Sequence, residues 1–169
     1  MYKLFFAFTF FISTLSFAQN LELKTTDASV NFNYYSKSTE GTLSNVEAEI
    51  NLNFTDLSQS VISGTADVST LSTENNSRDK HLMAEDFFDV EKYPTMKFTS
   101  SEIYKEGDLY FVKGMLTIKD VEQEVVFAMT VNETSIVLSI EIYALDYGVA
   151  TKKDREHSLV GVNIVLEIE

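Results

Sequence analysis

The chain has 169 residues, of which 13 are basic and 26 are acidic, so its formal net charge at pH 7 is −13. An acidic surface of this kind repels phosphate backbones, and nucleic acid is therefore not expected as a partner. The chain contains no cysteine, which excludes thiol catalysis, thiolate metal sites and disulfide bonds.

The first 18 residues have the order of a secretory signal peptide. Lys3 gives a positive start, Leu4 to Ile12 is an almost unbroken apolar run, and Ser16 and Ala18 place small side chains before Gln19. The apolar run is shorter than the ~20 residues that span a bilayer, so stable membrane insertion is not expected. We predict that residues 1–18 are removed, that residues 19–169 form one domain, and that the mature protein is periplasmic or secreted. Loss of Lys3 would leave a net charge of −14.

Apolar and polar residues alternate along most of the remaining chain. From Val46 to Phe54, for example, every second side chain is apolar, which is typical of a strand with one buried and one solvated face. Glu106-Gly107-Asp108 and Asn132-Glu133 have the composition of hairpin turns. The pattern predicts eight strands, near 28–34, 46–54, 60–70, 96–104, 109–118, 125–131, 136–144 and 160–168.

Eight half-buried strands indicate an all-β fold with one shared interior, in the form of a sandwich or a closed antiparallel barrel. A barrel of eight strands is either filled by its own side chains or holds one small ligand. The sequence has a single proline and no repeats, which is typical of one domain without linkers.

The alternation stops between Ser72 and Pro94. Asn76 or Ser77 is expected to cap a short helix that runs through Arg78 to Met83, and Pro94 is expected to end the excursion. Four apolar side chains should dock this excursion onto the barrel, namely Leu82, Met83, Phe87 and Phe88. A long connection over a barrel mouth is a place where function is often found.

The excursion and three later segments carry recognisable motifs. Ser77-Arg78-Asp79-Lys80-His81-Leu82, Asp86-Phe87-Phe88-Asp89-Val90-Glu91-Lys92-Tyr93-Pro94 and Phe98-Thr99-Ser100 follow one another in order. Gly114-Met115-Leu116-Thr117-Ile118 and Asp146-Tyr147-Gly148-Val149 come later in the chain. This set resembles the signature of the YceI-like family, whose members are known as polyisoprenoid-binding, lipocalin-like proteins.

The resemblance covers roughly residues 26–169. It implies an extended eight-stranded antiparallel lipocalin-like barrel with a short helical excursion, and an apolar lumen that holds an isoprenoid-type or similar long apolar lipid. It also implies a periplasmic or secreted location. The chain departs from the family pattern at Ala144, where relatives often have Arg, and near Phe32, where an expected His is absent.

The side chains predicted to contact such a ligand combine the excursion with the apolar strand faces. They are Phe32, Phe54, Arg78, His81, Leu82, Phe87, Phe88, Phe98, Leu116, Ile118, Phe127 and Met129. Composition by itself favours a filled core for the aromatic members, and only the resemblance favours a channel. On the strand near 109–118, two faces remain open: one with Tyr110 and Val112, and one with Leu109 and Phe111.

Two interpretations apply to the charged start of the excursion. Arg78 and His81 could orient a polar head group, with Asp79 fixing their geometry. Alternatively, Arg78 and Asp79 form a structural ion pair and cap, which is the commoner role at the start of a helix.

The residues offer little for catalysis. The chain has only two histidines, His81 and His157, too few for a zinc site without thiols, so no metal or other cofactor is expected. A hydrolase would need a nucleophile beside His81 and Asp86, and no serine has the glycines of a nucleophile elbow. We therefore predict a non-catalytic carrier or store of an apolar lipid. The alternatives are a stress-related protein-interaction module with a packed barrel and, less favoured, an enzyme acting on a small apolar compound. Exposed rim strands would allow two copies to pair as a homodimer.

Overall fold

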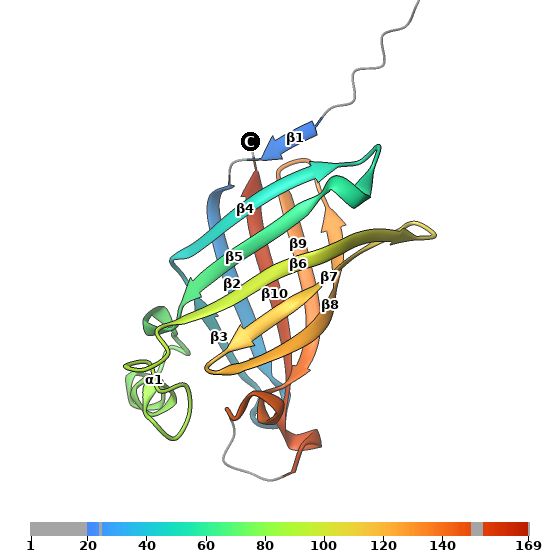
Figure 1. The fold of residues 1–169 in the computed structure, drawn as a ribbon. Helices are drawn as coiled ribbons and strands as arrows, with labels where there is room; N and C mark the ends of the chain where they lie inside the picture. The colour runs from blue at the N-terminus through green and yellow to red at the C-terminus, as the bar shows by residue number, and fades with distance from the viewer. Residues whose placement is uncertain (1–19, 24, 150–153, 169) are drawn as a thin grey trace, which may run out of the picture.

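The computed structural model describes residues 20–23, 25–149 and 154–168; the predicted signal peptide lies outside them. The described residues form ten strands, one α-helix and five short 3₁₀ helices (Figure 1). The strands are β1 (Asn20–Leu23), β2 (Thr25–Tyr34), β3 (Thr39–Leu43), β4 (Val46–Asn53), β5 (Val61–Asp67), β6 (Thr95–Glu106), β7 (Leu109–Ile118), β8 (Val121–Val131), β9 (Ser135–Tyr143) and β10 (Leu159–Ile168). The helices are α1 (Asn76–Met83), η1 (Tyr35–Lys37), η2 (Leu57–Gln59), η3 (Val68–Thr70), η4 (Ala144–Tyr147) and η5 (Glu156–Ser158).

All ten strands belong to one antiparallel sheet with the order β1-β4-β5-β6-β7-β8-β9-β10-β2-β3. The strands β1 and β2 follow each other in the chain, yet β1 pairs with β4 and β2 pairs with β10. The sheet therefore curls until its two ends meet, and it encloses an interior (Figure 1). This confirms the predicted all-β antiparallel barrel with a helical excursion.

The predicted number of eight strands is wrong, because β1 and β3 were not expected. The eight predicted strands correspond to β2 and β4–β10. The two additional strands are only four and five residues long, and β3 has Gly41 at its centre. Such short segments contain too few alternating positions for a period of two to be recognised.

The predicted turns are confirmed. Glu106-Gly107-Asp108 joins β6 to β7, and Gly107 has the positive φ of 60° that such a tight turn requires. In the next hairpin, the Asn132 N–H donates to the Ser135 carbonyl at 2.8 Å. These turns fix the pairing of β6 with β7 and of β8 with β9, and so they fix which side chains face the interior.

One end of the barrel is filled by side chains. Its core contains fully buried residues from β4, β7, β8, β9 and β10, among them Leu52, Val112, Phe127, Ile136 and Leu166. Val112 lies on the same face as Leu116 and Ile118, so this face of β7 points inward. The opposite face points out, because Leu109 is exposed and Phe111 stacks on Tyr104 at 5.5 Å.

The excursion lies at the other end of the barrel (Figure 1). Helix α1 begins at Asn76 and is capped by Asn75, whose side chain accepts from the N–H groups of Ser77 and Arg78. The predicted caps Asn76 and Ser77 are therefore wrong by one or two positions. Phe87 and Phe88 pack against a second apolar cluster, which consists of the buried residues Ile118, Tyr147 and Val149.

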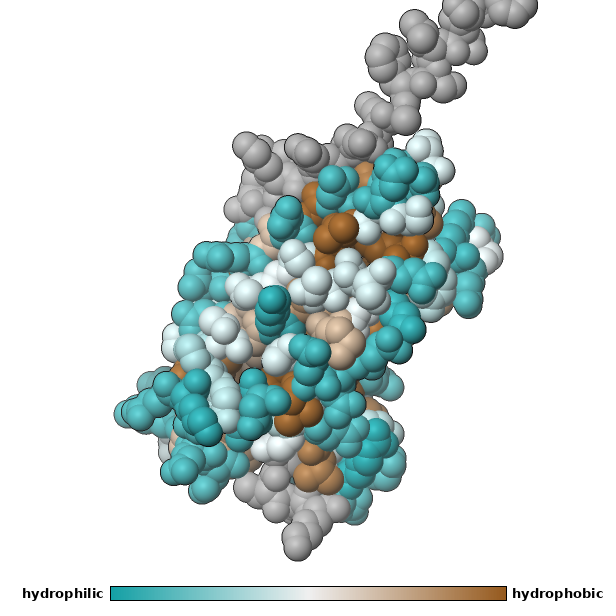
Figure 2. Space-filling model, viewed as in Figure 1, coloured by the Kyte–Doolittle hydropathy of each residue, from teal (hydrophilic) through white to brown (hydrophobic). Residues whose placement is uncertain are grey.

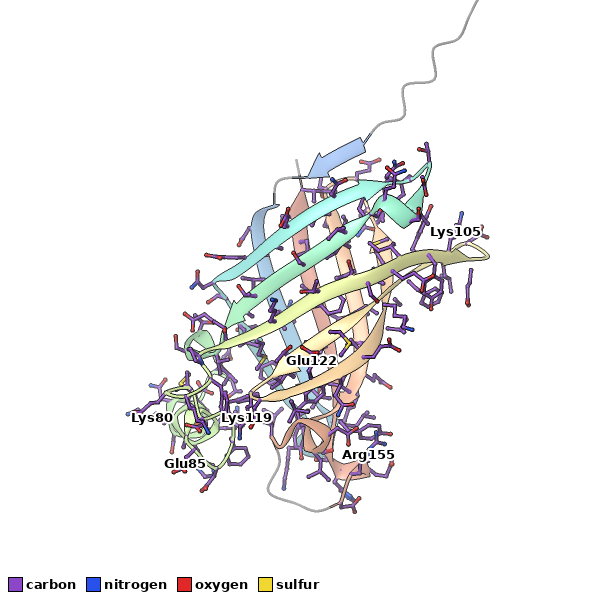
Figure 3. The ribbon with its side chains drawn as sticks, viewed as in Figure 1. Lys80, Glu85, Lys105, Lys119, Glu122 and Arg155 are labelled. Atoms are coloured by element: carbon purple, nitrogen blue, oxygen red, sulfur yellow. The ribbon has the colours of Figure 1, made fainter. Side chains whose placement is uncertain are left out.

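The outer surface is largely hydrophilic on the face seen in Figure 2. Charged side chains such as Lys80 on α1 and Lys105 at the end of β6 extend away from the barrel (Figure 3). Five of the six exposed large hydrophobic side chains lie on or beside the strands, at Phe54, Val61, Leu109, Val126 and Val131. Among the described residues, no helix is both long and apolar enough to cross a membrane.

Candidate binding cavity

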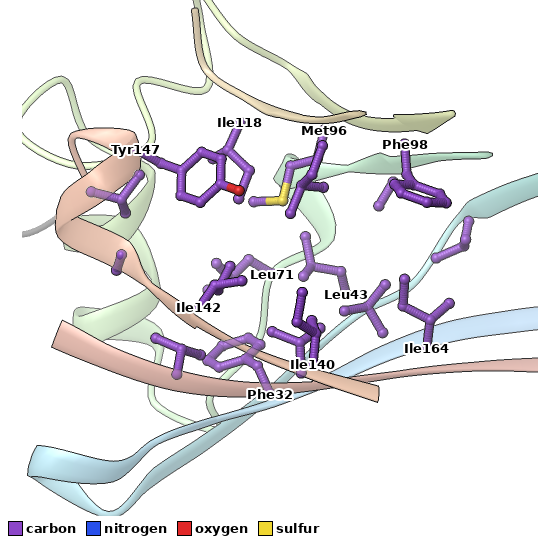
Figure 4. A pocket seen from close by; sticks show the side chains of 18 of the residues that line it. Phe32, Leu43, Leu71, Met96, Phe98, Ile118, Ile140, Ile142, Tyr147 and Ile164 are labelled. Atoms are coloured by element: carbon purple, nitrogen blue, oxygen red, sulfur yellow. The ribbon is translucent and has the colours of Figure 1, made fainter. Parts of the chain in front are cut away.

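An apolar cavity of about 410 Å³ lies inside the barrel. Its walls are β2, β9 and β10 on one side and β5, β6 and β7 on the other, and α1 and η4 contribute at the end opposite the filled core (Figure 4). The volume falls in the range of roughly 300–1,000 Å³ that is usual for small-molecule sites.

The register of β9, β10 and β2 explains how the wall is built. Each inward residue of β10 is paired with one residue on either side, so the side chains form rows across the wall. The rows, from the filled end to the open end, are Leu138-Ile164-Val30, Ile140-Val162-Phe32 and Ile142-Val160-Tyr34. All these residues point inward, yet only Leu138, at the floor, is fully buried, and the others are half-buried. An inward side chain that stays accessible faces empty space, so this part of the barrel is hollow.

The floor of the cavity is shared with the filled core. Phe98 and Phe127 line the cavity, are buried, and meet edge to face with ring centroids 5.0 Å apart. Ile62, Leu138 and Leu166 complete the floor. Because these side chains are closely packed, the cavity ends here and does not continue through the barrel.

The cavity reaches the surface beside Lys37 and His81, both of which are exposed. Arg78 lines the same mouth, but its guanidinium is occupied: Nε donates to the Thr73 hydroxyl and NH2 to the Thr73 carbonyl, both at 2.7 Å. No described aspartate or glutamate lines the cavity, although the chain has 26 acidic residues.

The predicted ion pair between Arg78 and Asp79 is wrong, because each of the two residues binds Thr73. Asp79 is buried and accepts from the Thr73 N–H at 2.9 Å and from the Thr73 hydroxyl. Both charged residues therefore bind Thr73 instead of each other. The structural role expected for them is present, and Arg78 additionally contributes to the cavity wall.

Tyr147 is a polar residue in this apolar wall. It ends η4, its side chain is only 2% exposed, and it lines the cavity. Burial, with a smaller contribution from the neighbouring Asp146 carboxylate, raises the pKa of the Tyr147 phenol to about 12. The Asp146 carboxylate is itself bound by Arg155 at 2.7–3.2 Å, and this bond lowers the pKa of Asp146.

Ten of the twelve predicted contact residues line the cavity. They are Phe32, Arg78, His81, Leu82, Phe87, Phe88, Phe98, Leu116, Ile118 and Phe127. The other two predicted residues, Phe54 and Met129, do not line it. Met129 is 4% exposed inside the filled core, and Phe54 is 40% exposed at the end of β4, where its ring meets Tyr110 at 5.8 Å. Both side chains lie at the filled end, below or outside the floor.

Several wall residues were not predicted as contacts. Those on β9 and β10, such as Ile140 and Val162, lie on the predicted apolar faces, so strand parity could have identified them. Met96 precedes Phe98 by two residues in the same predicted strand, so parity could have identified it too. Leu71 and Tyr147 have no such signal, because they lie in or next to irregular segments. Only the path of these connections brings them to the cavity.

The described residues contain no cluster of three histidines or carboxylates that could hold a metal ion. His81 meets the Phe87 ring edge to face at 4.8 Å, and no contact with Asp86 is recorded in the described part of the chain. His157 lies outside the barrel wall and pairs with Asp154 at 2.7 Å. The two histidines thus have separate surroundings, and neither has the neighbours of a hydrolytic site.

A curled antiparallel barrel with one filled end and an apolar cavity at the other is the architecture of a class of proteins that enclose small apolar molecules. The sequence profile of the YceI-like domain matches residues 21–169 of the chain. The chain belongs to the YceI-like family.

The curated relatives are similar over part of their length. A UPF0312 protein of Photorhabdus laumondii is 36% identical over 86 residues, which are 51% of this chain and 45% of that protein. The chain thus spans less than half of the curated relative it matches.

Solved structures show the same fold over most of the chain. BcnA of Burkholderia cenocepacia has a TM-score of 0.76 at 21% identity and covers 88% of this chain and 100% of its own. A polyisoprenoid binding domain from Saccharophagus degradans has a TM-score of 0.59 at 14% identity and covers 88% of this chain and 97% of its own.

Proposed function

We propose that this protein is a non-catalytic carrier or store that holds an isoprenoid-type or similar long apolar lipid in its barrel, outside the cytoplasm. The observation that carries the proposal is the hollow half of the barrel, where inward Ile, Val and Phe side chains surround about 410 Å³. The membership in the YceI-like family and the likeness to a polyisoprenoid binding domain support it.

Burial of the chain would supply the affinity. Each CH₂ group that leaves water for the cavity contributes roughly 0.8 kcal/mol. The wall offers few polar groups, so chain length and shape would dominate the selection of the ligand. The acidic surface of the protein, with its large net negative charge, would discourage non-specific adhesion to anionic membranes.

The packed-barrel alternative requires an interior that is completely filled. The half-buried inward residues of β2, β9 and β10 do not favour it. A role as an enzyme would require a reactive polar constellation in the lumen, and the described lining is mostly aliphatic and aromatic and contains no aspartate or glutamate. We therefore propose binding without chemistry.

The test is to purify the protein from the periplasmic or secreted fraction of bacteria that produce it, and to identify bound molecules by native mass spectrometry and organic extraction. The wild type is expected to retain a molecule with a long apolar chain. A protein that is exported, folded and free of any apolar ligand, and that binds none when lipid extracts are supplied, would contradict the proposal.

A pair of variants connects the ligand to the lumen. Val162→Phe adds a ring to the cavity wall, whereas Val126→Phe makes the same change at an exposed position on β8. A ring that displaces two CH₂ groups of the ligand would weaken binding by about tenfold. Val126→Phe is expected to bind like the wild type, and equal losses in both variants would place the ligand outside the barrel.

A further inference from the structure

The hydroxyl of Tyr147 has no hydrogen-bond partner within residues 20–23, 25–149 and 154–168, although the side chain is 2% exposed. Its ring is held by the second apolar cluster, between Ile118 and Val149. Figure 4 shows the hydroxyl oxygen directed into the cavity, toward Met96 and away from the η4 backbone. Buried tyrosines usually bind a partner through this group. The Tyr147 hydroxyl is therefore a donor that is available to a molecule in the cavity.

The surroundings of Tyr147 favour an uncharged partner. The Asp146 carboxylate acts on the Tyr147 phenol, and Arg155 neutralises this carboxylate outside the cavity. A charged oxygen at this depth would lose its hydration without gaining a cation, which is costly. The elevated pKa of Tyr147 keeps its phenol neutral, so it can donate one hydrogen bond.

The cations at the mouth do not change this preference. Arg78 already donates to Thr73 through two of its nitrogens. The other three basic residues of the lining are exposed to solvent, namely Lys37, His81 and Lys97. Water and dissolved salt screen exposed cations, which weakens their attraction for an anionic group. A neutral acceptor at Tyr147 therefore matches the wall better than an anionic head group at the mouth.

We propose that Tyr147 is a specificity-determining residue, and that its hydroxyl donates a hydrogen bond to an uncharged oxygen, such as a carbonyl oxygen, near one end of an apolar-chain ligand. This inference rests on the proposed function. Tyr147 lies at the open end of the barrel, so the chain extends from it toward the floor formed by Phe98 and Phe127. The cavity thus selects a lipid that is polar at one end without being charged.

The test compares three ligands of equal chain length: an alkene, a terminal methyl ketone and a carboxylate. Their affinities are measured by displacement of a fluorescent apolar probe from the wild type and from Tyr147→Phe, which keeps the ring and removes the hydroxyl. The wild type is expected to bind the ketone about two- to tenfold more tightly than the alkene, the gain that one net hydrogen bond gives. Tyr147→Phe is expected to bind both equally, with the affinity of the wild type for the alkene.

Infrared spectroscopy of the ketone provides a second readout that a purely structural role would not change. The C=O stretch is expected to shift to lower frequency on binding to the wild type but not to Tyr147→Phe. An unchanged preference in Tyr147→Phe, or a carboxylate that binds both proteins more tightly than the ketone does, would overturn the inference. If no ligand displaces the probe from the wild type, the proposed function itself fails.

Discussion

Thr73 joins the start of the excursion to helix α1. Its hydroxyl accepts from the Arg78 guanidinium and donates to the Asp79 carboxylate, and its N–H also donates to Asp79. One small side chain thereby satisfies an anion and a cation that are adjacent in the sequence. Because Thr73 is buried, these bonds take the place of the hydrogen bonds with water that its polar groups would otherwise need.

Asp79→Ala is predicted to destabilise the protein by about 1–3 kcal/mol, because the buried Thr73 N–H would lose its acceptor. Urea denaturation measures the change as a lower midpoint at constant slope. The matched control is Lys80→Ala, an exposed position in the same helix, where a change within about 0.5 kcal/mol is expected. Equal stabilities of the two variants would show that the Thr73 bonds contribute nothing.

The raised pKa of Tyr147 predicts that the free energy of unfolding depends on pH in the alkaline range. Its pKa is about 12 in the folded protein against 10.0 ordinarily, so folding favours the neutral phenol. The contribution of Tyr147 to the free energy of unfolding is therefore complete below pH 10 and falls as the pH rises from 10 to 12.

This dependence can be measured by denaturing the wild type and Tyr147→Phe at a series of alkaline pH values. The stability of the wild type relative to the variant should fall as the pH rises above 10. The near-ultraviolet absorbance of phenolate gives a second measure, in which the wild type should show an ionisation at about pH 12 that Tyr147→Phe lacks. A pH-independent difference between the two proteins would contradict the prediction.

At the scale of the elements, helix α1 is short and depends on its ends. Eight residues are too few for a stable isolated helix, so capping and packing must hold it. The Asn75 side chain accepts from two N–H groups of the first turn, at 3.2 and 3.1 Å. Asn76 is the first helical residue, and its side chain makes no hydrogen bond within the described part of the chain.

Asn75→Ala is predicted to destabilise α1 by about 1 kcal/mol, the usual contribution of an asparagine cap. Asn76→Ala is the matched control, because it replaces the same residue type one position later and should leave stability almost unchanged. Amide hydrogen exchange within α1 is the most direct measurement, since the excursion can open without unfolding of the barrel. Faster exchange in Asn76→Ala than in Asn75→Ala would show instead that Asn76 is the cap, as predicted from the sequence.

The strands show what alternation can and cannot predict. It places Phe127 on the inward face of β8, and the wall residues of β9 and β10 lie at alternating apolar positions, although they were not predicted as contacts. Alternation specifies the side of the sheet on which a residue lies, but not its depth along the barrel axis. For this reason Phe127 and Met129 looked equivalent in the sequence. In the structure Phe127 lines the cavity, whereas Met129, two residues further along β8, is buried in the filled core and does not line it.

The remaining part of the site depends on tertiary structure. Phe54 continues the parity of Leu52, but β4 ends at Asn53, and the chain carries the Phe54 ring to the rim. Tyr147 reaches the cavity only because η4 folds back over the end of the barrel. No local pattern in the sequence encodes either path.

The whole molecule combines a filled half and a hollow half. The filled half supplies the closely packed core, and the hollow half exposes apolar wall to the interior. A ligand in the lumen should therefore stabilise the folded state, by about 2.7 kcal/mol at one hundred times its dissociation constant.

Thermal or urea unfolding with increasing amounts of an apolar-chain ligand measures this stabilisation. Val126→Phe should respond like the wild type, and Val162→Phe should respond only at higher ligand concentrations. A ligand that stabilises all three proteins equally would act at the surface or through the solvent.

The homodimer expected from exposed rim strands stays a prediction. At the free edge of β3, the Thr42 N–H and carbonyl are already bound to Ser72, at 2.8 and 2.9 Å. A dimer would therefore have to pair elsewhere than at this point of the edge. Sedimentation velocity over a range of protein concentrations would show whether two copies associate.

The closed floor of the cavity has a kinetic consequence. With Phe98 and Phe127 packed across the barrel, a bound chain can leave only through the opening by which it entered. A second molecule cannot push it out from behind, so replacement must wait until the lumen is empty. The rate of exchange should then equal the spontaneous rate of release and be independent of the competitor's concentration, and a receiving membrane or protein could accelerate it only by acting at the mouth.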